Sequence, residues 1–497
     1  MGVPGSAVSR VTGVDVAYKN FNTGAAQSLP QRLAIFGQGN SDAVYDLTTY
    51  ECDGSAASVA ARYGYGSPLH IAALKLFPTA GVSATFPVTI YPLKEAASAT
   101  AATGIITVTG KATENTSGKI YIADTLAEFA VSKDDTAVTV MGAIKDAING
   151  VLEMPVVAAI ITPEGEDATP YIQLTSKWKG ASANLITIDL DAKNLNIGGL
   201  TFSKTDMAGG ALDPKIDDAL ARIGDVWETF LMDTLDWKNT DRLDTYQSFG
   251  DDRWGWLNKK GCVVAHGCTE DYATRTAITD QRKNDKINFL ITSVKSRALP
   301  FAICAKGLVS DIMTTADSNP AQGYKGQLTG IHAASAAEQE NYTVRNASVM
   351  KGASTNIKTG SVAELNDIIT FYHPESYGKF PPYRKVVNMV KLQNVVYNVR
   401  LVMEAEEFKE APLVEDSTVT DNPTAVQPKT VKAALYTLAD SLAKKAIIQQ
   451  PDFTKKNMTV AIDGENPDRI NVKFPVKLSG NVTVSSSEIF FGFYLGE

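Results

Sequence analysis

The chain closes on the aromatic run Glu488-Ile489-Phe490-Phe491-Gly492-Phe493-Tyr494-Leu495-Gly496-Glu497. A run of such high β propensity is costly to leave in water, so it needs a partner strand. We expect residues 489–495 to form a strand whose large apolar side chains contact another subunit. Those side chains are Ile489, Phe490, Phe491, Phe493, Tyr494 and Leu495.

The residues before this run supply candidate partner strands. From residue 469 to residue 478 apolar and polar side chains alternate, which is the pattern of a half-buried strand. Pro475 cannot donate a hydrogen bond to a ladder, so the strand is expected at a sheet edge or beside a bulge. Gly480-Asn481 predicts a turn, after which the alternation resumes. The side chains expected to accept a strand from a neighbouring subunit are Val472, Phe474, Val476, Val482 and Val484.

An amphipathic helix is predicted over residues 429–448, ahead of these strands. Asp440 lies four residues before Lys444, which is the spacing of a helical ion pair. The C-terminal region therefore combines a helix, a strand pair and a terminal strand, and it leaves one sheet edge unpaired. In an assembly, an extended segment of one subunit can complete such a sheet in the next subunit.

Length and composition indicate a soluble protein of several domains. The chain has 497 residues, and an expectation of about 150 residues per domain predicts roughly three domains. Hydrophobic residues make up 44% of the chain and charged residues 21%, as is ordinary for globular proteins. The net charge of −8 gives no overall electrostatic reason to bind nucleic acid or an anionic membrane.

The lack of a recognisable signal peptide and the spacing of the cysteines favour a protein that folds in the cytoplasm. Residues 1–6 lack the basic and apolar segments of a signal peptide, and no run of about eighteen apolar residues occurs, so no membrane insertion is expected. The cysteines match neither zinc-ligand nor redox spacing, and we expect buried free thiols. They are Cys52, Cys262, Cys268 and Cys304.

Changes of composition divide the chain into segments, and the predicted fold class is a multidomain mixture of α/β and α+β. Residues 1–30 are expected to form an extended N-terminal arm. Residues 31–94 and 211–385 alternate strands with helices, which predicts a layered α/β core. Residues 95–210 carry short alternating runs that predict an inserted β-rich domain facing outward. Residues 386–486 are expected to form a C-terminal α+β domain, and residues 487–497 its arm strand.

The individual elements follow from periodicity and capping residues. In the core, strands are predicted at residues 32–37, 88–93, 229–232, 262–266 and 287–291, and helices at 242–249, 270–282 and 301–313. The alanine-rich residues 55–77 are expected to be helical in places. Asp213 is expected to cap a further helix, with Pro214 at its first position. In the insert, strands are predicted at residues 104–110, 118–122, 156–162, 171–175 and 185–190, and a helix at 138–148.

Motifs for catalysis are weak. Gly37-Gln38-Gly39 after a strand suggests a dinucleotide fingerprint, but Asp42 stands where the third glycine belongs, so a plain turn is favoured. His266 lies between Cys262 and Cys268 at a spacing that no metal site uses, which favours a structural role. Residues 251–252 and 404–407 predict acidic surface, with a carboxylate pair for acid–base catalysis as the alternative. We therefore expect no cofactor, no metal and no catalysis.

Several short segments together carry a family resemblance. They are Val3-Pro4-Gly5, Leu29-Pro30-Gln31-Arg32-Leu33-Ala34-Ile35-Phe36-Gly37-Gln38, residues 103–110, Trp178-Lys179-Gly180, Met207-Ala208-Gly209-Gly210, Asp252-Arg253-Trp254-Gly255, Arg345-Asn346-Ala347, Lys351-Gly352-Ala353-Ser354-Thr355, Gly360-Ser361-Val362, Ile368-Ile369-Thr370 and Asn466-Pro467-Asp468-Arg469-Ile470-Asn471-Val472. In this collinear order they resemble the tail sheath protein of Mu-like contractile-tailed bacteriophages. Each segment is structural and weak alone, so the joint order carries the resemblance.

The resemblance implies a sheath subunit that polymerises helically in stacked rings around an inner tube. Such a sheath contracts from a metastable extended state and drives the tube through a cell envelope. The implied partners are further copies of the chain, the tail tube protein, and baseplate and tail terminator proteins. The implied location is a virion tail assembled in the host cytoplasm.

Two sets of residues are candidates for these contacts. Strand exchange would use the C-terminal run together with Val14, Val16, Tyr18 and Phe21 of the N-terminal arm. Lys432, Lys444 and Lys445 on the predicted helix are candidates for contacts to an acidic tube surface, with a solvated helix face as the alternative. Two other functions stay open, a non-contractile structural virion protein and an enzyme on the α/β core. A ligand that shifts thermal stability would favour the enzyme.

Overall fold

The computed structural model describes residues 26–165, 169–191, 193–377, 381–489 and 491. These residues form two compact units, each with its own apolar core. The larger unit comprises residues 30–393 and the described residues from 480 onward, and the smaller unit comprises residues 26–29 and 394–479. The division falls within helix α10 (Val386–Met403).

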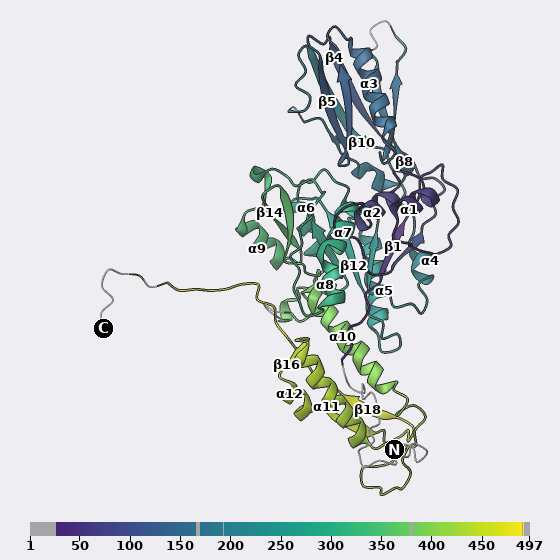
Figure 1. Ribbon diagram of the computed structural model, residues 1–497, viewed down its shortest axis with the longest axis vertical. Helices are drawn as coiled ribbons and strands as arrows, with labels where there is room; N and C mark the ends of the chain where they lie inside the picture. Colours follow the sequence, from purple (N-terminus) through teal and green to yellow (C-terminus); the bar gives the residue numbers. More distant parts are fainter. Residues whose placement is uncertain (1–25, 166–168, 192, 378–380, 490, 492–497) are drawn as a thin grey trace, which may run out of the picture. The chain divides into compact units, whose positions relative to one another are not determined.

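The larger unit is built on a six-stranded sheet with the order β13-β12-β11-β1-β3-β2. Strands β1 and β12 of this sheet are labelled in Figure 1. Neighbouring strands are parallel except β2 and β3. The parallel strands are buried along their whole length, as expected for a sheet covered on both faces. The strands are β1 (Leu33–Gly37), β2 (Tyr50–Glu51), β3 (Val88–Pro92), β11 (Phe230–Asp233), β12 (Val263–Cys268) and β13 (Asn288–Thr292).

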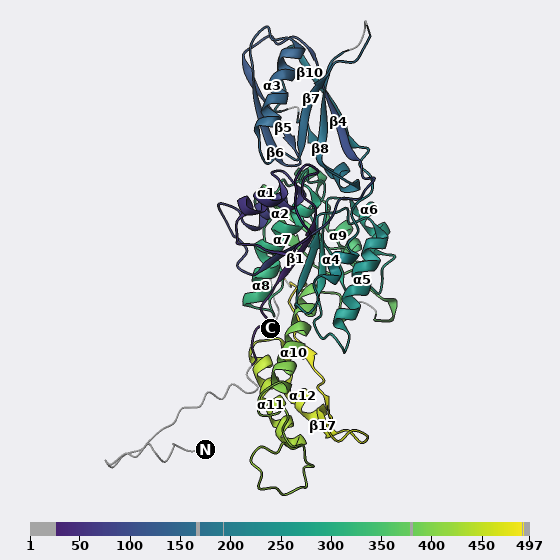
Figure 2. The same ribbon diagram turned by 90° about the vertical axis from the view of Figure 1, so that its right-hand side faces the viewer.

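Helices cover both faces of this sheet. In Figure 2, α1 (Ala56–Tyr63) and α2 (Pro68–Leu76) lie on one side of β1, and α4 (Asp217–Ala221) and α5 (Thr240–Trp254) lie on the other. Leu33 and Ile35 belong to the first core, whereas Ala34 and Phe36 belong to the second, because successive side chains of a strand point to opposite faces. The α/β core predicted from the sequence is confirmed.

The remaining elements of the larger unit complete these layers. Helix α7 (Pro300–Gly307) packs with α2 on the first face and continues through a π-helical turn (Leu308–Ile312) into α8 (Met313–Ser318). Helix α6 (Tyr272–Thr279) connects β12 to β13. Beyond them lie α9 (Tyr342–Met350), the hairpin β14 (Thr355–Thr359) and β15 (Val362–Asn366), and short helical turns at Ala336–Glu338 and Glu375–Tyr377.

The insert consists of two antiparallel sheets with helix α3 (Ala137–Gly150) packed in their shared core. One sheet has the order β10-β4-β8-β7 and the other β6-β5-β9. The strands are β4 (Ala101–Gly110), β5 (Thr116–Ile122), β6 (Thr125–Val131), β7 (Val156–Ile161), β8 (Tyr171–Lys179), β9 (Ile188–Asp189) and β10 (Leu200–Ala208), with a 3-10 turn at Ala181–Leu185. The ends of the insert meet where Thr100 pairs with Ala211, so it leaves and rejoins the core at one place.

The smaller unit packs α11 (Pro428–Lys444) against the second part of α10 and a set of short strands. The predicted stripe Val431, Leu435, Leu438 and Leu442 is buried, at 1% exposure or less. The strand pairs are β16 (Ile448–Gln449) with β19 (Lys477–Leu478), and β17 (Thr459–Ile462) with β18 (Ile470–Lys473), and α12 (Pro451–Asn457) lies between β16 and β17 in the sequence. Among the described helices, none combines the length and the hydropathy needed to span a bilayer.

Several local predictions are wrong, and three of them have a clear physical reason. Helix α4 begins at Asp217, because the Asp213 carboxylate accepts from the Ser182 backbone N–H at 2.9 Å instead of capping a helix. Asp440 pairs with Lys455 of α12 at 2.6 Å and not with Lys444. The strand expected over residues 469–478 is interrupted at residues 474–476, around Pro475, and divides into β18 and β19.

Candidate assembly site

The described part of the C-terminal arm is exposed and has no partner strand among the described residues. Residues 479–489 contain no strand, so the alternation that resumes at Val482 does not form the predicted second strand here. Val482, Val484, Ile489 and Phe491 are 94%, 78%, 82% and 94% exposed. Phe490, Phe493, Tyr494 and Leu495 lie outside the described residues. Four large apolar side chains on one short segment of the larger unit make it a candidate joint.

The root of this arm is held by side-chain hydrogen bonds within the larger unit. Asn481 Nδ2 donates to the Ala321 carbonyl at 2.8 Å, and Lys391 Nζ donates to Asn481 Oδ1 at 2.9 Å. Lys385 Nζ donates to the Thr483 hydroxyl at 3.3 Å. Burial, together with the positive charge of Lys385, lowers the pKa of Lys391 to about 8. The arm is therefore fixed at residues 481–483, and the apolar side chains follow.

The predicted strand-accepting residues fall into two groups. Val472, Phe474 and Val476 are half-buried and pack against the core of the smaller unit. Val482 and Val484 lie on the arm itself and belong to the larger unit. Among the described residues, β17 and β18 pair only with each other, so each keeps one free edge. A free edge presents the unpaired N–H and C=O groups that an added strand needs.

The root of the N-terminal arm lies along α10 and α11 within the smaller unit. The backbone N–H groups of Ala26, Gln27 and Leu29 donate to Ser441 Oγ, Asn398 Oδ1 and Asn394 Oδ1 at 2.7, 2.6 and 2.9 Å. The predicted exchange residues Val14, Val16, Tyr18 and Phe21 lie outside the described residues. Sequence reasoning missed Asn394 and Asn398, because an asparagine in a helix gives no periodic signal.

The three candidate tube-contact lysines are not gathered in one patch. Lys432 is half-buried, and its ammonium lies 5.8 Å from the centre of the Tyr436 ring. Lys444 and Lys445 are exposed at the other end of α11, about 18 Å away at the usual helical rise of about 1.5 Å per residue. Lys445 Nζ also donates to the Ser28 hydroxyl at 3.4 Å. Lys444 and Lys445 remain a candidate pair.

At the carboxyl edge of the parallel sheet, where α/β enzymes commonly bind ligands, Lys177 and Lys179 of the insert contact the turn that follows β1. After β1, the N–H groups of Gly39, Asn40 and Ser41 donate to the Tyr45 hydroxyl and to the carbonyls of Tyr63 and Lys177, at 3.0, 2.9 and 2.9 Å. Gln38 Nε2 donates to the carbonyl of Lys179 at 2.5 Å. These donors are used within the protein, which supports a plain turn in place of a phosphate cradle.

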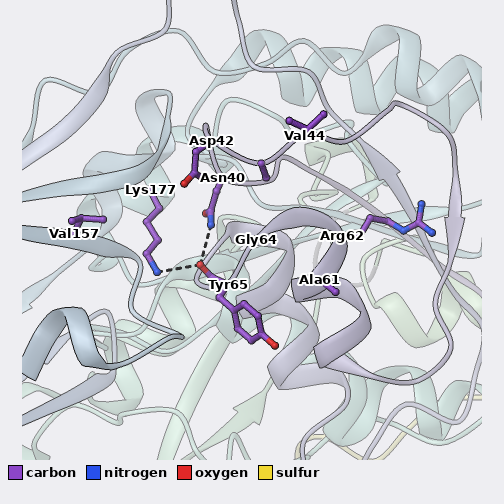
Figure 3. Close-up of a pocket in the computed structure, with 10 residues that line it drawn as sticks. Asn40, Asp42, Val44, Ala61, Arg62, Gly64, Tyr65, Val157 and Lys177 are labelled. Atoms are coloured by element: carbon purple, nitrogen blue, oxygen red, sulfur yellow. Dashed lines mark hydrogen bonds between the residues drawn. The ribbon is translucent and has the colours of Figure 1, made fainter.

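A surface depression of about 460 Å³ lies beside this turn (Figure 3). In Figure 3 Asn40 and Lys177 converge on the carbonyl oxygen of Tyr65, to which they donate at 2.9 and 3.1 Å. A second contact joins the same two parts, because Arg297 binds the carboxylates of Asp124 and Asp189 at 3.0 and 2.9 Å. The polar groups at this junction therefore hold the insert to the core.

Comparison with known proteins points to one class of structural protein. No protein-family model matches the chain. The Mu-like prophage FluMu tail sheath protein of Haemophilus influenzae is 26% identical over 400 residues, which are 78% of this chain and 79% of that protein. The resemblance to Mu-like tail sheath proteins is confirmed. A crystal structure of a sheath tail protein from Listeria innocua gives a TM-score of 0.48 at 11% identity, covering 92% of this chain and 94% of that one.

Several charged and polar side chains inside the α/β core are buried beside polar or charged neighbours. His266 Nε2 lies 3.0 Å from Asn288 Oδ1, and burial lowers the pKa of His266, so the ring is neutral near pH 7. Arg242 lies between the carboxylates of Asp213 and Asp233, each at 3.5 Å, and these three residues are no more than 7% exposed at the side chain. The structural role predicted for His266 fits this environment.

The other predicted chemical features are ordinary in their surroundings. Asp251 and Asp252 are exposed, as expected, and Asp251 pairs with Lys286 at 3.1 Å. Cys262, Cys268 and Cys304 are buried free thiols, whereas Cys52 is half-buried, because it follows the short edge strand β2. Within the described part of the chain, no group of three or more His, Cys, Asp or Glu side chains is arranged to hold a metal ion.

Proposed function

We propose that the chain is the structural subunit of a contractile phage tail sheath. It polymerises helically around an inner tube and contracts from a metastable extended state to drive that tube through the target cell envelope. The observation that carries the proposal is the 26% identity with a Mu-like tail sheath protein over 78% of this chain. The exposed apolar arm supports it, because a subunit that works alone gains nothing from side chains such as Phe491 at 94% exposure.

Strand exchange is the proposed joint between subunits. The arm residues Ile489 to Leu495 of one subunit, and Val14 to Phe21 of another, add to the short sheets of the smaller unit in a neighbour. The free edges of β17 and β18 support this proposal, since main-chain hydrogen bonds to an open edge give affinity and the alternate side chains give specificity. Head-to-tail contacts of identical subunits that do not close into a ring generate a helix.

Contraction draws on burial between subunits and needs no nucleotide. Burying a few hundred Å² of apolar surface per subunit is worth on the order of 5 to 10 kcal/mol before entropy costs, and many subunits act together. In this arrangement the smaller unit lies next to the tube, with Lys444 and Lys445 as contact candidates, and the insert faces outward. The tail tube, baseplate and tail terminator proteins are the proposed partners, and the assembled location is the virion tail.

Negative-stain electron microscopy of the purified, untagged protein tests the proposal. Without tube or baseplate, sheath subunits should assemble into the lower-energy contracted form. We expect hollow helical cylinders with a wide lumen. Discrete particles at high protein concentration would contradict the proposal and favour a subunit that works alone, for which a thermal-shift screen of ligands is the next measurement.

A further inference from the structure

We propose that helix α10 anchors the roots of both arms, with Asn394 and Asn398 positioning the N-terminal arm and Lys391 positioning the C-terminal arm through Asn481. The anchoring itself is a property of the single subunit. Its consequence for assembly rests on the strand exchange proposed above. Each anchor lies within one unit of the chain, the first in the smaller unit and the second in the larger.

The N-terminal anchor imitates a β ladder with side chains. Gln27 N–H donates to Asn398 Oδ1 at 2.6 Å, and Asn398 Nδ2 donates back to the Gln27 carbonyl at 2.8 Å. This reciprocal pair is what a neighbouring strand would supply. Two residues further along, the Leu29 N–H donates a single hydrogen bond to Asn394 Oδ1 at 2.9 Å. Asn394 and Asn398 are four residues apart, so they lie on one face of the helix and meet two residues of the same extended segment.

Burial makes this anchor specific. Asn394 and Asn398 are 0% and 1% exposed, and Ala26 and Leu29 of the arm are 8% and 4% exposed. A buried amide that loses its partner pays its desolvation cost without compensation, so the arm root is held in this one register. Two buried asparagines in a helix are otherwise hard to explain, because asparagine lowers helix propensity and is seldom buried.

The C-terminal anchor joins one arm residue to two elements. Asn481 accepts from Lys391 of α10 and donates to the Ala321 carbonyl beyond α8. Lys391 is 0% exposed, and burying its ammonium without hydrogen-bond acceptors would be costly. From Thr483 to Ile489 the chain can span at most about 20 Å, and the intervening Ser485-Ser486-Ser487 is flexible in composition. The anchor therefore fixes the origin of a short tether, which limits the neighbouring sites that the apolar strand can reach.

Amide hydrogen exchange of the single subunit, resolved to individual residues, tests the N-terminal anchor. In Asn398→Ala, the Gln27 amide should exchange about tenfold faster, because its acceptor is lost, while the Leu29 amide keeps its protection. Asn394→Ala should give the reverse pattern. Asn388→Ala is the matched control, since Asn388 also lies on α10 but donates only to the Pro382 carbonyl among the bonds described for its side chain. Equal exchange at Gln27 in Asn398→Ala and the unaltered chain would overturn the anchor.

Amine labelling read by mass spectrometry tests the C-terminal anchor. In Asn481→Ala, Lys391 should react at least severalfold faster with an acylating reagent at pH 8, because the arm root no longer covers its ammonium. Lys306, which is 5% exposed in the same unit, is the buried control and should not change. Asn398→Ala should leave Lys391 labelling unchanged, and Asn481→Ala should leave Gln27 exchange unchanged. Unchanged Lys391 labelling in Asn481→Ala would overturn this anchor.

The effect of the anchors on assembly is measured separately from hydrogen exchange and amine labelling. If the unaltered protein forms polymers, each anchor variant should raise the concentration needed for assembly, since a looser tether lowers the effective concentration of the arm strand. Unaltered assembly in variants whose arm roots are shown to be released would overturn the positioning role. If the unaltered protein forms no polymers while the exchange and labelling changes occur, the proposed function fails and the anchoring stands.

Discussion

Replacing the exposed apolar side chains of the C-terminal arm should weaken assembly without affecting the folded subunit. Ile489 and Phe491 are 82% and 94% exposed, and they lie two residues apart, so in a strand they share one face. Burying each against a neighbour is worth about 2 kcal/mol. The double variant Ile489→Ser/Phe491→Ser should therefore lose about 4 kcal/mol per joint, which is about a thousandfold in the concentration needed for assembly.

The assay is sedimentation of polymer over a range of protein concentrations, paired with thermal unfolding of the unassembled subunit. The unfolding temperature should stay the same, because neither side chain is buried in the subunit. Val419→Ser is the matched control, since Val419 is 96% exposed on a loop of the smaller unit and is not part of the arm. Assembly of the double variant at the same concentration as the unaltered protein would refute the reasoning that these side chains form the joint.

Three further predictions concern the insert, the tube and pH. Replacing residues 101–210 with a short linker should leave cylinders intact in electron micrographs, because Thr100 and Ala211 are already paired; loss of cylinders by a folded variant would argue against an outward-facing insert. Lys444→Glu/Lys445→Glu should reduce co-sedimentation with tube, unlike the control Lys409→Glu, and equal co-sedimentation would exclude that contact. Burial and the nearby charge of Lys177 lower the pKa of His70 from 6.5 to about 4. Between pH 6.5 and pH 4 the unfolded chain therefore binds more protons at His70 than the folded chain does. The free energy of unfolding should fall as the pH is lowered through this range. In His70→Gln the unfolding temperature should fall less steeply between pH 6.5 and pH 4. An unchanged pH dependence would contradict the role assigned to His70.

The sequence predicts the elements that repeat a simple period. The run Leu33-Ala34-Ile35-Phe36-Gly37 is apolar at every position because β1 is covered on both faces, and that signal needs no knowledge of the partners. The stripe of α11 is equally direct, since its four residues face one core. The insert is recognised by its composition, although its periodicity does not predict β6 or β10. In β10 the exposed polar residues obscure the alternation.

The sequence does not predict elements whose partners are distant in the chain. Helix α10 is the clearest case, because residues on all sides of it are buried, including Lys391, Gln393 and Asn394 at 0% exposure, so no polar face reveals its period. The sequence does not predict the anchors for the same reason, because the bonded residues Gln27 and Asn398 are 371 residues apart in the chain. Asp213 looks like a cap because its true partners, Ser182 and Arg242, are not visible in the local sequence.

The structure of a single subunit does not test the strand-exchange residues. An aromatic run after a polar linker predicts that something must cover it, but the cover belongs to another copy of the chain. The sequence signal for tube contact is weak, because lysines on an exposed helix face are common. The structure also separates Lys432 from Lys444 and Lys445. These residues stay predictions that only an assembled polymer can test.

The most direct test of the account is a cryo-electron microscopy reconstruction of the polymer at a resolution that traces the main chain. We predict that residues 489–495 of one subunit form a strand hydrogen-bonded to a short sheet edge of a neighbour, within reach of an arm that is still anchored at Asn481. A polymer in which that arm folds back onto its own subunit, with neighbours joined only through the α/β cores, would contradict the account.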